Sequence, residues 1–102
     1  MVRDLDEAEP WLRKAANAGH HGGEGNLGLL LKLRGDLDEA EPWLRKAADA
    51  GRHEAELNLG LLLDEQGRTE EAEQWYQRAA DASHHNEEVA ARAEQKLRDL
   101  RQ

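Results

Sequence analysis

The chain contains an internal repeat with a period of 32 residues. Residues 4–35 and 36–67 align without a gap and are identical at 24 of 32 positions, and a third copy, residues 68–99, keeps 10 of 32. Periods of roughly 20–50 residues are typical of stacked arrays, in which each unit buries its apolar face only against its neighbours. The sequence therefore predicts a single domain over residues 1–102, built from three similar units.

The first half of each unit has the periodicity of a helix whose buried face carries a tryptophan. In residues 38–50 this face, spaced i, i+3, i+4 and i+7, consists of Ala40, Trp43, Leu44 and Ala47. Asp38 and Glu41 have the spacing of a capping box, Pro42 falls at the edge of the predicted first turn, and Gly51 follows the end. The tryptophans recur at positions 11, 43 and 75. Their constant place in the repeat predicts a role in a repeated core.

The second half of each unit is richer in leucine. Residues 53–66 carry five leucines, with Gly67 beyond them. A strand is disfavoured because the alternation of apolar and polar residues is absent and no β-branched residue occurs. We therefore expect about six helices in an all-α, right-handed solenoid of antiparallel helical hairpins, with units 4–35, 36–67 and 68–99. The segment at about 86–101 is predicted to be a capping helix, since its outer face is polar.

These residues resemble a known family. The spacing of the tetratricopeptide repeat is followed by Asn58, Leu59, Gly60, Leu63, Gly67, Ala72, Tyr76 and Ala79. Residues 75–80 and 50–53 look more like the Sel1-like branch of that superfamily, although Glu24 and Glu56 stand where the tetratricopeptide pattern often has Trp. The resemblance implies a protein-interaction module or scaffold.

Composition excludes several other functions. With 22 acidic and 14 basic residues the formal charge is -8, which disfavours binding to nucleic acid or to an anionic membrane. There is no cysteine, which excludes disulfides, thiolate metal sites and thiol nucleophiles. No apolar stretch is long enough to span a membrane and no signal-peptide pattern is present, so a cytoplasmic location is expected. Catalytic motifs are missing, and Ser83 and Thr69 are the only serine and the only threonine. We expect no enzyme activity and no cofactor.

Three histidines recur with the repeat, namely His21, His53 and His85. Neighbouring helices pack about 8–10 Å apart, whereas the ligands of one zinc ion all lie within about 2.1 Å of it. Successive turns therefore cannot easily converge on one ion. His84 and Glu88 have the spacing of a local ligand pair, but two groups fall short of a site. No metal site is predicted.

The leucine-rich helices are expected to line a concave groove that binds a peptide or a helix. Helical spacing places on this side Asn26, Leu29, Leu33, Leu57, Asn58, Leu61, Asp64, Glu65 and Val89. The alternative is that tight curvature buries these leucines inside the array. Residues 36–67 hold nine acids and three bases, so the expected partner is neutral or basic with apolar anchors. The side chains that would hold a peptide carboxylate in some tetratricopeptide domains are mostly absent.

The first helix, about residues 4–18, has no leucine-rich helix before it in this sequence. Its apolar face is expected to be partly uncovered and to support self-association, and carries Ala8, Trp11, Leu12 and Ala15. Gly22, Gly23 and Gly25 are expected to fray the start of the next helix, which offers a second route to a homodimer by domain swapping. The rival to the groove hypothesis is therefore a self-associating or idealised repeat protein with no outside ligand.

Overall fold

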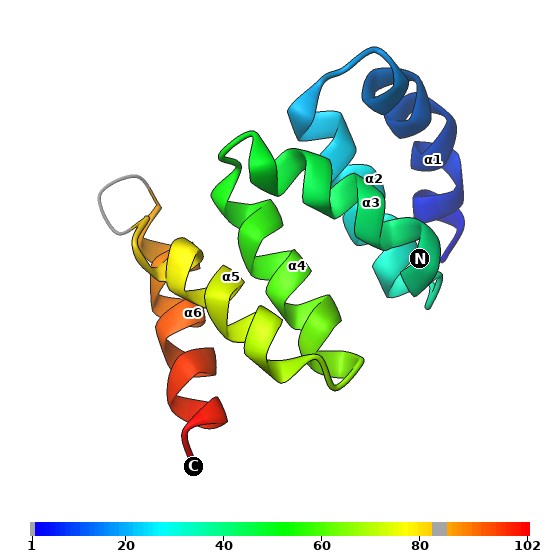
Figure 1. Cartoon of the computed structure of the whole chain (residues 1–102). Coiled ribbons are helices and arrows are strands. Elements are labelled where there is room, and N and C mark those ends of the chain that lie inside the picture. Colours follow the sequence, from blue (N-terminus) through cyan, green and yellow to red (C-terminus); the bar gives the residue numbers. More distant parts are fainter. Residues whose placement is uncertain (1, 83–85) are drawn as a thin grey trace.

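The computed structural model describes residues 2–82 and 86–102. The predictions for Ser83, His84 and His85 lie outside the described residues. Six helices follow one another along the described chain: α1 (Val2–Asn17), α2 (His21–Leu33), α3 (Leu37–Asp49), α4 (His53–Glu65), α5 (Thr69–Ala80) and α6 (Glu87–Leu100). Figure 1 shows them arrayed in order, with α1 at one end and α6 at the other. The predicted all-α solenoid of helical hairpins is confirmed.

Glycines end the helices where the repeat predicts them. Gly51 has a φ of +88° and Gly67 a φ of +78°, the left-handed region that favours glycine. At the end of α3 the amide of Gly51 donates to the carbonyl of Ala48 at 2.9 Å. The amide of Arg52 donates to the carbonyl of Ala47 at 3.1 Å. This pair of bonds satisfies carbonyls that the helix leaves open and turns the chain into α4.

The start of α3 differs from the prediction. The helix begins at Leu37 after Asp36, because the amide of Ala40 already donates to the carbonyl of Asp36 at 2.9 Å. Asp38 therefore lies in the first turn and is not the cap, and the predicted capping box is wrong. Pro42 lies inside α3, past the first turn. Proline has no backbone N–H, so α3 lacks one of its helical hydrogen bonds at this position. In the first turn this would cost nothing, because the N–H groups there have no partner within the helix.

Two kinds of helix alternate. We call α1, α3 and α5 the Trp-bearing helices and α2, α4 and α6 the groove helices. Among the described residues α3 packs between α2 and α4, α5 packs between α4 and α6, and α1 packs against α2. A single apolar core runs from Ala16 to Leu97.

Glycines allow the two kinds of helix to approach closely. A Cβ placed on Gly28 would lie 2.6 Å from Leu44 Cγ, and one on Gly60 would lie 2.7 Å from the ring of Tyr76. Gly23 lies in α2, where its Cβ would meet that of Ala15 at 2.6 Å. The glycines at the start of α2 are thus part of a helix, and Gly23 has a packing role that the sequence did not reveal.

The tryptophans are not equally buried. Trp75 is 8% exposed and has the guanidinium carbon of Arg78 4.8 Å from the centre of its ring. Trp43 is half-buried under Lys46, and Trp11 is 73% exposed. A core role therefore holds for Trp75 and in part for Trp43, but not for Trp11. No helix in the described part of the chain is long and apolar enough to cross a membrane.

Candidate functional site

The three groove helices enclose a depression of about 450 Å³. Side chains from all three helices line it, namely Leu29 and Leu33 of α2, Glu54, Leu57 and Asn58 of α4, and Glu88, Val89 and Arg92 of α6, together with Asn86. A smaller space of about 30 Å³ lies beside it towards the α2 N-terminus and shares Leu29, Glu54 and Asn58. Asn26 borders this smaller space. The structure thus brings together six of the nine residues predicted to line the groove.

The apolar side chains of this depression form a buried floor and a more exposed edge. Leu57 is 2% exposed and Val89 is 5% exposed, so both belong to the core and form a floor. Leu29 is half-buried, and Leu33 is 61% exposed at the edge. The prediction of an open apolar stripe is therefore wrong for Leu57 and Val89, because α4 packs against both α2 and α6 and these side chains are buried among the groove helices. A ligand would touch mainly Leu29 and Leu33.

The other end of the predicted groove is occupied by contacts within the chain. Leu61 is half-buried, packs against the core and does not line the depression. Asp64 Oδ2 accepts a hydrogen bond from the Tyr76 hydroxyl at 3.0 Å. Burial, and secondly this bond to Asp64, raise the pKa of Tyr76. Glu65 forms an ion pair with Lys32 Nζ at 3.0 Å, which joins α4 to α2. All three residues thus make contacts within the chain, Leu61 and Asp64 are half-buried, and Glu65 remains exposed.

The polar side chains that line the depression differ in their exposure to solvent and in their hydrogen bonds. Glu54, Glu88 and Arg92 are exposed at its rim, so acids outnumber bases there. Asn58 is half-buried beside the apolar floor. The Asn86 side chain caps α6 by accepting from the amide of Val89 at 3.1 Å. Of the two amide side chains that line the depression, Asn86 therefore serves as a helix cap and Asn58 lies beside the apolar floor.

A histidine paired with a buried glutamate recurs at the start of two groove helices. His21 Nδ1 lies 2.7 Å from Glu24 Oε1, and His53 Nδ1 lies 3.0 Å from Glu56 Oε1. Glu24 is 4% exposed and Glu56 6% exposed. Both carboxylates lie in the first turn, where the helix dipole favours negative charge. The sequence shows each of these histidines three residues before a glutamate in two successive units. This shared spacing could have predicted the pairs, but the sequence analysis considered the histidines and the glutamates separately.

Among the described residues, no group of three or more side chains of the metal-binding types converges on one point. The absence of a metal site stays a prediction. The absence of a cofactor likewise stays a prediction.

Arginines connect successive Trp-bearing helices. Arg13 of α1 bonds to Glu9 at 2.7 Å and to Glu39 of α3 at 2.8 Å. Arg45 of α3 repeats this pattern one unit later, with Glu41 at 2.7 Å and Glu71 of α5 at 2.8 Å. The ion pairs within one helix follow from the i, i+4 spacing of the two residues. The ion pairs between helices form only because the fold brings successive Trp-bearing helices together.

Two further arginines join the same clusters from the turns. Arg34 pairs with Glu9 and Asp6, and Arg68 pairs with Glu41 at 2.8 Å. Hydrogen bonds from Arg34, and then from Arg13, lower the pKa of Glu9. Burial alone raises the pKa of Glu41, but the bonds from Arg45 and Arg68 outweigh it and lower that pKa. These clusters connect successive units of the array.

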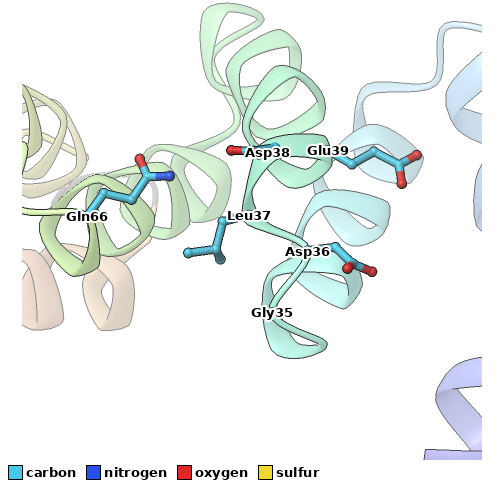
Figure 2. A pocket seen from close by; sticks show the side chains of 6 residues that line it. All are labelled: Gly35, Asp36, Leu37, Asp38, Glu39 and Gln66. Carbon is cyan, nitrogen blue, oxygen red and sulfur yellow. The ribbon is translucent and has the colours of Figure 1, made fainter.

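A wider hollow of about 510 Å³ lies at the turn between α2 and α3. It is lined by Gly35, Asp36, Leu37, Asp38, Glu39 and Gln66. Figure 2 shows that the three carboxylates point in different directions and do not converge on one point. Glu39 is moreover bonded to Arg13. This hollow has no arrangement suited to a ligand, although it is larger than the depression between the groove helices.

The predicted self-association face is mostly closed. Ala8 and Leu12 are half-buried and pack against the core, and Ala15 is half-buried against Gly23. Trp11 alone of the four stands open, with 73% of its surface exposed. The prediction of a broad uncovered apolar face on α1 is therefore corrected to one exposed tryptophan, because α2 covers the rest.

The stacked helical hairpins define a helical-repeat protein. The family model described as tetratricopeptide repeat matches residues 23–83, and the chain belongs to this family. The search of the curated proteins found no match. Tetratricopeptide repeats generally mediate protein–protein interaction and are a non-catalytic fold. The Sel1-like branch stays a prediction.

Proposed function

We propose that this protein binds a peptide or a short helix of a partner protein in the depression between the groove helices. The observation that carries the proposal is that α2, α4 and α6 together build one hollow with an apolar floor and a polar rim. Ligand sites combine apolar contact area with a few placed polar groups in this way. The site is small, so the contact is with a short segment of the partner.

The chemistry of the ligand follows from the lining. Leu29 and Leu33 offer apolar contact for a leucine-sized anchor of the ligand, and Asn58 offers an amide for its backbone. Glu54 and Glu88 at the rim favour a lysine or arginine beside that anchor, while Arg92 limits the favourable positions. The partner segment is therefore neutral or basic with an apolar side chain. A peptide ending in acidic residues does not fit this rim.

The test is selection of peptides from a randomised displayed library on the immobilised protein. Enriched peptides should carry Leu, Ile or Phe next to Lys or Arg. Their affinity, measured by fluorescence anisotropy, should fall by at least about tenfold in Leu33→Glu. This residue is 61% exposed, so the variant should keep the helical content of the wild type.

Gln77→Glu provides the matched control, since Gln77 is exposed on α5 and outside the depression. It adds the same charge to the chain and should leave the affinity unchanged. A library with no enriched sequence class would contradict the proposal, as would peptides that bind Leu33→Glu as tightly as the wild type. Either result would favour a repeat protein without an external ligand.

A further inference from the structure

Three charged side chains at the rim of the depression have no partner in the described part of the chain. Glu54, Glu88 and Arg92 are exposed, line the depression and form no ion pair or hydrogen bond with another described side chain. The four arginines that connect the Trp-bearing helices, by contrast, all bond to carboxylates. The rim therefore offers charges of both signs to a bound molecule.

The acids and the base lie at different levels of the groove helices. Glu54 and Glu88 lie in the first turns of α4 and α6, where the helix dipole favours a carboxylate. Arg92 lies one turn after Glu88, which is about 6 Å along the helix axis. In the repeat it takes the place of Gly28 and Gly60, and the helix dipole does not account for its charge. A ligand therefore meets a negative and then a positive side chain along α6.

The apolar edge of the depression lies on the other side of α4. Leu29 and Leu33 belong to α2, and α4 packs against both α2 and α6. Successive side chains of an extended peptide point to opposite sides, and those of residues i and i+2 are about 6.6–7 Å apart. This distance matches the separation of Glu88 and Arg92. Two charged side chains of an extended peptide can therefore face α6 while the residue between them faces the leucines of α2.

We propose that the depression selects an extended segment in which a basic, an apolar and an acidic residue follow one another. The basic side chain pairs with Glu88 and the acidic one with Arg92. The apolar side chain packs on Leu29 and Leu33. Either order along the peptide satisfies this charge pattern, and the order sets the direction in which the segment lies. This specificity rests on the proposed function of the depression, and Arg92 is the residue that determines it.

Three pools of labelled peptides test the charge pattern by fluorescence anisotropy. They carry Lys-Leu-Glu, Glu-Leu-Lys or Lys-Leu-Lys at the centre, with blocked termini and the same mixture of uncharged flanking residues. One of the two mixed-charge pools should bind the wild type about two- to fivefold more tightly than Lys-Leu-Lys, as expected for one exposed ion pair. The net charge of the rim, with two acids and one base, would by itself favour Lys-Leu-Lys.

Arg92→Glu should invert this order, because the acidic side chain of the peptide then meets a carboxylate. Arg98→Glu is the matched control, since Arg98 is exposed on the same helix and lies outside the depression. It changes the charge of the protein by the same amount and should keep the wild-type order. Both arginines are exposed, so circular dichroism should show wild-type helical content in both variants.

The outcomes separate the charge pattern from the proposed function. Binding of Lys-Leu-Lys as tightly as both mixed-charge pools would overturn the charge pattern and leave peptide binding in place. An order that Arg92→Glu leaves unchanged would do the same, and would show that Arg92 only keeps the end of the array polar. If no pool binds and the displayed library yields no sequence class, the proposed function fails, and the charge pattern with it.

Discussion

Gly60→Ala tests whether close helix contact sets the geometry of the array. The new Cβ would lie 2.7 Å from both Cδ1 and Cε1 of Tyr76. Carbon atoms pack best at about 3.5–4.0 Å, so the ring has to move by about 1 Å. Tyr76 is 0% exposed and its hydroxyl bonds to Asp64 at 3.0 Å, so neither the core nor this bond permits an easy shift.

The magnitude follows from opposing effects. Overpacking of this kind costs about 1–3 kcal/mol, and weakening the Tyr76–Asp64 hydrogen bond costs about 1 kcal/mol more. Alanine is better than glycine in a helix by about 1 kcal/mol, which offsets part of the loss. We therefore expect the free energy of unfolding to fall by about 1–3 kcal/mol in Gly60→Ala.

Gly25→Ala is the matched control, because Gly25 also lies in a groove helix. Its Cβ would meet Ala47 Cβ at 3.5 Å and Ala55 Cβ at 3.7 Å, which are ordinary contacts. Only the helix propensity should act there, raising the free energy of unfolding by about 0.5–1 kcal/mol. Urea unfolding followed by far-UV circular dichroism measures both values. A Gly60→Ala protein as stable as the wild type, with an unchanged m-value, would refute the reasoning.

Three further predictions concern single side chains. Tyr76→Phe should lower the free energy of unfolding by about 1 kcal/mol, measured with urea, since it removes the bond to Asp64 and keeps the ring; an unchanged value would show that this bond adds nothing. The pKa of Glu41 is lowered in the fold, so its contribution to stability is present above the ordinary value of 4.5 and is lost as the pH falls through the folded pKa. Glu41→Gln should therefore have a shallower loss of stability in acid than the wild type, and equal slopes would contradict this. Leu59→Ala, at a site that is 0% exposed, should cost about 2–5 kcal/mol in the same urea assay, and a loss below about 1 kcal/mol would show that the site collapses around the missing side chain.

The sequence predicts much of the fold because the repeat shows every local signal at least twice. Helices and turns could be placed because the same features recur in neighbouring units. These features are the tryptophan face, the leucine-rich segment and the glycines at 51 and 67. The start of α3 could not be placed, since Asp36 and Asp38 are both acceptable caps by residue type. The backbone hydrogen bond from Ala40 to Asp36 decides between them.

The candidate site was predicted only in outline. Helical spacing predicted Leu29, Leu57 and Val89 on one side of the groove helices, and all three line the depression, but spacing could not tell which of them stays accessible. Leu33 is 61% exposed and Leu57 2% exposed, although both are leucines of groove helices. Exposure depends on the distance between neighbouring helices, which periodicity within one helix does not contain.

By itself, the sequence determined the number and kind of helices, their alternation and the repeat family. These depend on interactions between residues close in the chain, and so does the ion pair of Glu9 with Arg13. Only the tertiary structure decided the curvature of the array, the bonds of Arg13 and Arg45 to the next Trp-bearing helix, and the isolated exposure of Trp11. The physical reason is that these features arise where helices meet, and small side chains such as Gly28 and Gly60 set how closely they meet.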